Sequence, residues 1–434
     1  MTFQRNSRVS RAPRILLVGT FALGFAGLVS GQSPLLLEDA LREARAANAR
    51  LPVRAYDVSV AREKRSEALA ERWLKVALEG DFLYAPENGY DPALTNLGDA
   101  RLQAVARQPL YEGGALKAAA ARAEAGVAAA SARYHIAEKD LDLEVRSRYA
   151  ELVAARDEVD VRRVGIERLA SYRTLLRSRQ AAGQGVAADV LKTDVRIGLE
   201  EAAAAEAEQR QEEARLALNG LMGRDPVAPL EAVAPGLPEP PAAADVSAWE
   251  TAPEIAVAEA EASSAEADVA IARAERRPHI ALTADLGFWT SDTTHLGSDF
   301  WDRLWRDRGY SFALVLSVPL WDLGAIRARE AQADFSLKQA RAELEANRRE
   351  ARLALAQATS AVRNLYRQLQ ILRRAVPDSR DSYLEMESRY RGGTASALEV
   401  LDASGSAIEA SVRLIEVTAR YQVARAVALR WSSP

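Results

Sequence analysis

The chain contains no cysteine among its 434 residues. Disulfide bonds, thiolate metal sites, cysteine nucleophiles and a lipidated N-terminal cysteine are therefore excluded. Histidine is nearly as scarce, because only His135, His279 and His295 occur, and they show no metal-ligand spacing. The sequence also lacks a phosphate-binding loop and a serine nucleophile elbow. We therefore expect a protein that is not an enzyme and that holds no metal and no cofactor.

Aromatic residues make up only 6% of the chain, and the formal net charge is small, at −4. Because charges of both signs are interspersed, a nucleic-acid-binding surface is not indicated. Alanine, arginine and glutamate fill long stretches, while glycine and proline gather at a few points. This bias favours long helices over a compact mixed domain.

Long apolar runs are absent except at residues 15–30, which follow Arg5, Arg8, Arg11 and Arg14. A basic segment, an apolar core of about 15 residues and a small-residue exit predict a secretory signal peptide over residues 1–31. The mature chain would then start near Gln32. A retained membrane anchor is the alternative, although a spanning helix needs about 20 residues.

Two pairs of segments match each other within the chain. Residues 109–114 (PLYEGG) resemble residues 319–324 (PLWDLG) at an offset of 319 − 109 = 210. Residues 183–191 (GQGVAADVL) resemble residues 393–401 (GTASALEVL), and 393 − 183 is again 210. An unchanged offset predicts that one helix length is used twice.

The duplication predicts the domain organisation. A first structural repeat of helix, β-hairpin and long α-hairpin is expected over residues 32–223, and a second over residues 251–434. Residues 224–250 are rich in proline, which forbids a regular helix, so we interpret them as a linker.

Apolar and polar residues alternate in two segments of each repeat, at 75–84, 101–107, 279–288 and 310–318. This period predicts strands with one apolar and one polar face. A soluble sheet with one wet face fits the pattern, and so does a membrane barrel with a hydrated lumen. In the barrel interpretation, Tyr84, Phe288 and Trp289 would form an interfacial aromatic girdle. The residues that would face the lumen are Arg101, Gln103, Arg107 and Asp285.

Two proline-poor stretches, at 115–182 and 325–392, carry apolar residues spaced by seven, which predicts coiled-coil helices of about 100 Å. Pro377 should kink or briefly end the second of these helices. The glycines at 183, 185, 392 and 393 permit sharp turns into antiparallel helices.

Three carboxylates follow these glycine turns, namely Asp189, Glu399 and Asp402. They could be favourable charges at helix N-termini, or an acidic ring if several chains repeat them around a constriction. A second feature is the aromatic loop at 289–309, with an apolar cluster that we interpret as self-packed rather than as a binding site. The cluster comprises Phe300, Trp301, Leu304 and Trp305.

The ordered set of duplicated motifs resembles the TolC-like outer-membrane efflux protein family over nearly the whole mature chain. The segments that carry the resemblance are APEIAVAEAEASSAEADVAIARAERRPHIAL, the PLYEGG and PLWDLG pair, and YRGGTASALEVLDA at 390–403. The resemblance implies a mainly α fold with a membrane β-barrel portion. In a homotrimer, each chain would give four strands to a twelve-stranded barrel and two α-hairpins to a tunnel.

The resemblance also implies a function and a location. The protein would lie in the outer membrane of a Gram-negative bacterium, in contact with its lipid, and extend into the periplasm. It would be the passive exit duct of a tripartite efflux pump, coupled to a periplasmic adaptor and an inner-membrane transporter. A type I protein secretion duct and a coiled-coil adaptor without a pore are the alternatives.

Site residues follow from the matching motifs. The strand-to-helix junctions would be marked by Pro109, Gly113, Gly114, Pro319 and Gly324, because proline ends a strand and glycine permits the turn. The periplasmic gate and acidic ring would comprise Tyr390, Asp189, Glu399 and Asp402.

Three positions depart from the family pattern. Glu399 replaces an expected aspartate, which keeps the charge but lengthens the side chain. Ala395 stands where some members carry a gate-locking arginine, and Leu323 interrupts the glycine pair of the second junction.

Overall fold

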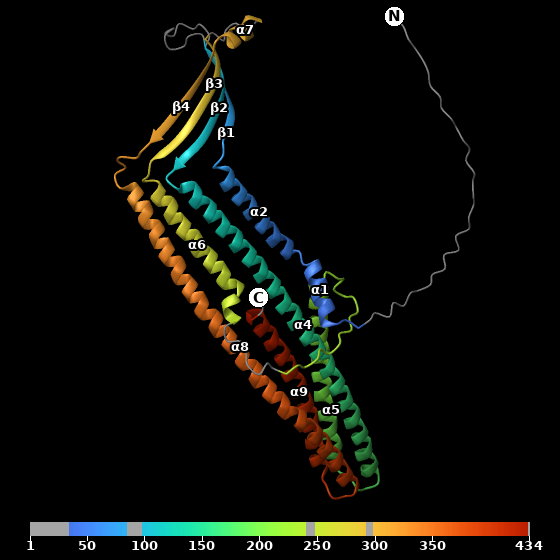
Figure 1. Cartoon of the computed structure of the whole chain (residues 1–434). Helices are drawn as coiled ribbons and strands as arrows, with labels where there is room; N and C mark the ends of the chain where they lie inside the picture. The colour runs from blue at the N-terminus through green and yellow to red at the C-terminus, as the bar shows by residue number, and fades with distance from the viewer. Residues whose placement is uncertain (1–33, 85–97, 240–247, 292–297, 433–434) are drawn as a thin grey trace, which may run out of the picture.

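The computed structural model describes residues 34–84, 98–239, 248–291 and 298–432. The predicted signal peptide at 1–31, His295 and residues 240–247 of the predicted linker lie outside this part. A curved sheet occupies one end of the molecule, and long helices run from it to a tip at the other end (Figure 1).

The described strands form one antiparallel sheet in the order β1-β2-β3-β4. Alternating apolar residues of each strand line up across the sheet, for example Leu78 opposite Ala104 and Ala104 opposite Leu286. The middle pair, β2 with β3, joins the two halves of the chain. The strands are β1 (Lys75–Leu83), β2 (Asp99–Glu112), β3 (His279–Ser291) and β4 (Arg308–Ser317).

Helices α4 (Ala115–Ala181) and α8 (Ala325–Arg391) contain 67 residues each and run the length of the helical part (Figure 1). At 1.5 Å per residue each spans about 100 Å. Shorter helices fill the space beside them in the half near the sheet and in the half near the tip. These are α1 (Leu37–Ala47), α2 (Arg50–Ala70), α5 (Ala187–Leu221), η1 (Ala248–Thr251), α6 (Pro253–Ala274) and α9 (Ala397–Ser432).

The heptad positions form the helical core, as the sequence predicted. In α4, Val145, Leu152 and Val159 are buried at intervals of seven residues. In α8, Leu355, Val362 and Leu369 are buried in the same way. Helix α8 continues through Pro377, so of the two predicted outcomes the brief end of the helix does not occur.

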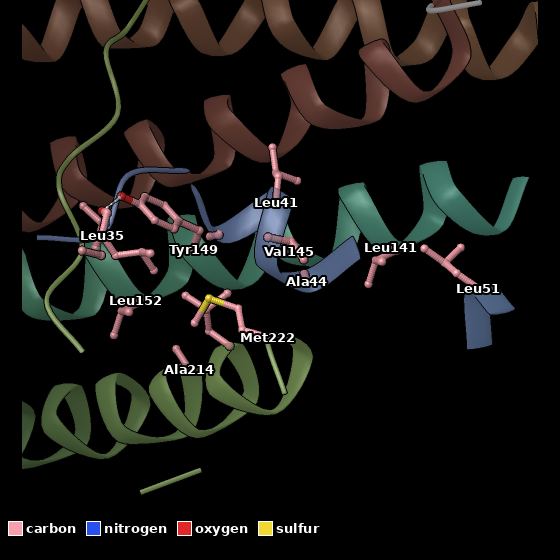
Figure 2. Close-up of a cluster of buried hydrophobic side chains, with 14 residues drawn as sticks. Leu35, Leu41, Ala44, Leu51, Leu141, Val145, Tyr149, Leu152, Ala214 and Met222 are labelled. Atoms are coloured by element: carbon pink, nitrogen blue, oxygen red, sulfur yellow. Dashed lines mark hydrogen bonds between the residues drawn. The ribbon is translucent and has the colours of Figure 1, made fainter. Parts of the chain in front are cut away.

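Tyr149 of α4 packs among α1, α5 and Leu35, which lies just before α1, near the middle of the molecule (Figure 2). Its buried hydroxyl lies 2.7 Å from the carbonyl oxygens of both Leu35 and Val233. Tyr421 of α9 donates a similar 2.7 Å hydrogen bond to the carbonyl of Pro238. The described part of the proline-rich segment is therefore packed against the helices and is not a free tether.

Among the described residues, none of the helices combines the length and the apolar composition needed to span a membrane.

Candidate functional site: sheet faces, junctions and helical tip

The four predicted lumen residues lie on one face of the sheet. Arg101 is opposite Asp81, Gln103 is opposite Glu79, and Arg107 is opposite Lys75. Directly opposite residues of antiparallel strands share a face, so β1 and β2 present one polar surface. Asp285 continues this surface on β3, where its carboxylate accepts a 3.1 Å hydrogen bond from the Ser311 hydroxyl of β4.

The opposite face of the sheet is apolar and uncovered over most of its area. On β4, Tyr310, Phe312, Leu314 and Leu316 are all more than 60% exposed. A monomeric soluble protein rarely shows a contiguous apolar surface of this kind. The apolar face therefore needs a lipid or protein environment.

Trp289 does not join the girdle to which the sequence assigned it. It is opposite Arg101 in the register, on the polar face, whereas Phe288 faces the apolar side opposite Leu102. The Trp289 indole packs over Gly309 of β4, where a larger residue would clash, because a Cβ atom built on Gly309 would lie 2.8 Å from the ring. The alternation that places Phe288 outward must place its neighbour inward.

The aromatic loop contains a short helix, α7 (Ser298–Arg306), instead of the predicted self-packed loop. Phe300 and Leu304 are buried against Ala100 and Phe288, on the apolar side of the sheet. The remaining two members of the predicted cluster, Trp301 and Trp305, are exposed.

Both strand-to-helix junctions have the same backbone conformation. Gly113 and Gly114 have φ angles of 63° and 96°, and Leu323 and Gly324 have φ angles of 56° and 91°. At the first junction, a Cβ atom on Gly113 would lie 2.6 Å from the carbonyl oxygen of Ala274. Leu323 is exposed and adopts the left-handed conformation in spite of its side chain. The prolines precede these turns, and β2 shows a register irregularity at Pro109.

At the tip, Tyr390 is buried and does not project as a free gate residue. Its ring contacts Tyr172 of α4 edge-on, with centroids 5.4 Å apart. The Arg179 guanidinium lies 4.6 Å from the Tyr390 ring centroid and donates a 2.7 Å hydrogen bond to the carbonyl of Arg391. Burial raises the pKa of Tyr172 above its ordinary value. Sequence reasoning missed Arg179, which supplies a cation at the tip although Ala395 does not.

Two of the three tip carboxylates lie in the first turns of their helices, Asp189 in α5 and Glu399 in α9. Glu399 forms a reciprocal cap with Ser396, whose backbone N–H and hydroxyl donate to it at 2.6 and 2.9 Å. These hydrogen bonds lower the pKa of Glu399 below its ordinary value. Asp402 is exposed one turn further along α9. The helix-cap interpretation therefore applies to Glu399, and Asp402 is free to face solvent.

A buried charge network links α4 to α5, and the sequence alone did not reveal it. Glu158 pairs with Arg162 at 2.8 Å and with Arg210 at 2.9 Å. Glu200 pairs with Arg162 at 2.9 Å and with Arg196 at 3.0 Å. Both carboxylates are almost fully buried. Within the described ranges, no cluster of three or more histidine, aspartate or glutamate side chains could hold a metal ion.

These features define an elongated wall segment: an open sheet with one polar and one apolar face, continued by two long α-hairpins. The sequence profile described as "Outer membrane efflux protein" matches residues 40–224 and 246–430. The chain belongs to this family, and it is an outer-membrane protein. Because the family consists of transport conduits, membership also confirms the prediction that the chain is not an enzyme.

Relatives and solved structures agree with this assignment. The chain is 28% identical to outer membrane protein OprJ of Pseudomonas aeruginosa over 265 residues, which is 58% of this chain and 52% of OprJ. It is 26% identical to the pyoverdine export outer membrane protein OpmQ of the same organism, over 67% of this chain and 61% of OpmQ. The chain thus spans a little over half the length of these relatives.

The fold matches that of the outer-membrane channel OprN with a TM-score of 0.78 and 23% identity, over 91% of this chain and 89% of OprN. The outer membrane protein VceC of Vibrio cholerae gives a TM-score of 0.78 at 19% identity, over 91% and 95% of the two chains. These matches confirm the predicted fold class, a mainly α fold with a β portion.

Proposed function

We propose that the protein is the passive exit duct of a tripartite efflux pump and works as a homotrimer. The observation that carries this proposal is that the strand register places the polar residues on one face of the sheet and the apolar residues on the other. An apolar outer surface and a charged inner surface suit a barrel wall between lipid and a hydrated lumen. Four strands are too few to close such a barrel, since membrane barrels begin at about eight strands, so several chains must share it.

Unpaired edges support assembly from several copies. Strands β1 and β4 pair on one side only, which leaves an edge at each end of the sheet. In the tip half, α4 packs against both α5 and α9, and α9 packs against α8, so α5 and α8 are the two flanking helices. Helix α5 exposes Leu191, Val195 and Leu199 at intervals of four residues. An apolar stripe of this kind on a flanking helix suits contact with α8 of the next chain.

The two halves of the chain would act as equivalent wall segments. We assign residues 32–223 and 251–434 to two structural repeats and residues 224–250 to the connection between them. Energy would come from an inner-membrane transporter that is coupled through a periplasmic adaptor, because no nucleotide-binding motif occurs in the sequence. OpmQ is named for pyoverdine export, and SrpC of Pseudomonas putida is named for solvent efflux. Such names favour small-molecule efflux over protein secretion, and the transporter would select the substrate.

The tip would form the periplasmic constriction. Three copies of Asp189, Glu399 and Asp402 would make an acidic ring that attracts cations, and the buried Tyr390 would hold the hairpin ends together. Replacing Glu399 and Asp402 with alanine should weaken block by a polyvalent cation such as hexamminecobalt in planar bilayers. Unchanged block would remove these two residues from the pore.

The decisive test is the native mass of the protein extracted in detergent from an outer-membrane fraction. A trimer that conducts ions in planar bilayers is the expected result, and a soluble monomer or dimer would overturn the duct. Cysteine introduced at Gln103 should react with a water-soluble maleimide in the assembled trimer, because the lumen is wet. Protection of this cysteine would instead indicate a packed sheet.

A further inference from the structure

The surface of α7 is divided into three stripes. Phe300 and Leu304, four residues apart, face the sheet and are buried. Trp301 and Trp305, again four residues apart, form the adjacent stripe and are 61% and 57% exposed. The charged residues occupy the remaining side of the helix, since successive residues are about 100° apart. They are Asp299, Asp302, Arg303 and Arg306.

Helix α7 is fixed to the apolar side of the sheet. Ala100 and Phe288, which it covers, belong to the same face as Leu102 and the exposed apolar residues of β4. The Trp305 ring contacts the Phe288 ring edge-on at 4.8 Å. The backbone N–H of Trp289 donates a 3.0 Å hydrogen bond to the backbone carbonyl of Asp307, directly after α7. The exposed tryptophans are therefore held at a defined position.

The two ends of the apolar face are both marked by exposed aromatic or large apolar side chains. Beyond the end of β4 that leads to α8, Leu320 and Trp321 are 92% and 83% exposed. Strand β4 itself contains 10 residues. At about 3.3 Å per residue and a tilt near 40°, this corresponds to about 25 Å of height, which is the apolar band of an outer-membrane barrel. Helix α7 lies at the end of the sheet that is distant from the helices (Figure 1).

We propose that α7 is an interfacial anchor that places Trp301 and Trp305 in the headgroup layer of the outer leaflet. This inference rests on the proposed function, because it needs the apolar face of the sheet to face lipid. Tryptophan prefers the boundary between acyl chains and headgroups, where its ring is apolar and its N–H can bind water. The charged stripe then lies toward water, as in amphipathic helices that lie in a membrane interface.

The position of α7 favours lipid over a second copy of the chain as the partner. Its buried side chains rest on the two inner strands, β2 and β3, and not on the edge strands β1 and β4. A neighbouring chain that pairs at a sheet edge would leave α7 on the outside of the barrel. Helix α7 also adds aromatic side chains to the apolar side of the sheet near β3, where Trp289 lies on the polar face and contributes none.

The test uses the absence of cysteine, because each introduced cysteine is unique. Trp301→Cys carries the probe, and Arg306→Cys is the matched control on the same helix, about 140° around its axis. Leu314→Cys reports on the middle of the apolar face, and Gln103→Cys reports on the polar face. Each variant is labelled with an environment-sensitive fluorophore, as the trimer, and reconstituted into phosphatidylcholine vesicles. One set of vesicles carries bromine near the headgroup end of the acyl chains, for positions 301 and 306, and another carries it near the middle of the chains, for position 314.

We expect emission at position 301 to fall by at least about twice the fraction lost at position 306. Quenching at 314 without a difference between 301 and 306 would overturn the anchor and leave the duct intact. Quenching at 301 without quenching at 314 would overturn the lipid-facing sheet and, with it, the anchor that depends on this sheet. If emission falls at neither 301 nor 314, both the anchor and the proposed duct are overturned.

A second measurement does not depend on cysteine labelling. Replacement of Trp301 and Trp305 with phenylalanine should reduce the quenching of intrinsic tryptophan emission by the same brominated vesicles. Unchanged quenching would overturn the anchor.

Discussion

Substitution of alanine for Gly113 tests how the first strand-to-helix junction is built. Two costs add at this position. A left-handed backbone costs an L-residue about 1–2 kcal/mol. A Cβ atom would also lie 2.6 Å from the Ala274 carbonyl oxygen and 2.9 Å from the Arg277 Cβ, so one helix end must move. Forced overpacking typically costs about 1–3 kcal/mol, and the expected total is about 2–5 kcal/mol.

The second junction provides the matched control. Leu323 has the same backbone conformation, with φ 56°, but its side chain is exposed. Leu323→Gly removes about 1–2 kcal/mol of strain, and the added freedom of the unfolded chain offsets about 0.5–1 kcal/mol of this gain. This substitution should therefore be neutral or stabilising by up to about 1.5 kcal/mol.

Both variants can be compared by guanidinium titration of the helical circular dichroism signal in detergent. The difference in unfolding free energy between Gly113→Ala and Leu323→Gly should be at least about 2 kcal/mol. Equal stability of the two variants would refute the crowding argument at Gly113. It would mean that the α6–β3 turn moves away from the junction at little cost.

Three further predictions concern the helices. Glu158→Ala should destabilise the chain by about 1.5–3 kcal/mol, because it removes a buried carboxylate that pairs with Arg162 and Arg210, although Arg162 keeps Glu200 and Arg210 is half exposed. Glu208→Ala breaks an exposed pair and should cost less than about 1 kcal/mol, and equal costs in a denaturant titration would contradict this. Ser396→Ala should destabilise α9 at pH 7 and much less in acid, because hydrogen bonds from Ser396 lower the pKa of Glu399 and their contribution is lost as the pH falls through that lowered pKa. A pH-independent difference in thermal stability would refute the cap. Arg179→Ala removes the contacts of Arg179 with the Tyr390 ring and the Arg391 carbonyl, so the α4–α8 contact at the tip should be weakened by about 1–2 kcal/mol and single-channel conductance should rise. An unchanged conductance would show that this contact does not limit the opening.

Much of the fold could be predicted because it depends on periodic patterns. The spacing of Val145, Leu152 and Val159 by seven residues fixes a buried seam, and the observed helix keeps all three inside. The alternation around Arg101 and Leu102 fixes two sheet faces, and the register places them as expected. In each case a single period decides which side chains are buried.

The errors lie where a side chain departs from its local pattern. Trp289 was grouped with Phe288 because both are aromatic, although adjacent residues of a strand must face opposite sides. The left-handed Leu323 could be located by its offset from Gly113, but sequence gives no measure of the space around it. The apolar cluster around Trp301 suggested local packing, and only the fold shows that half of it faces outward.

The tip residues show a third limit. Tyr390 and Glu399 were both assigned from a motif, yet one is buried against α4 and the other caps its own helix. Arg179 was missed because its partner is more than 200 residues away in the sequence. Contacts between hairpins depend on how two long helices align at their ends, and this information is not local.

Helices α4 and α8 have equal lengths, so the length of one constrains the length of the other. Both start after a left-handed glycine at the sheet and end at neighbouring hairpin turns, 67 residues later. Inserting seven residues into one of them would move its turn by about 10 Å, and a single inserted residue would rotate it by about 100°. Changes in the length of the helical part must therefore occur in both helices together, so its length can be redesigned only in matched increments.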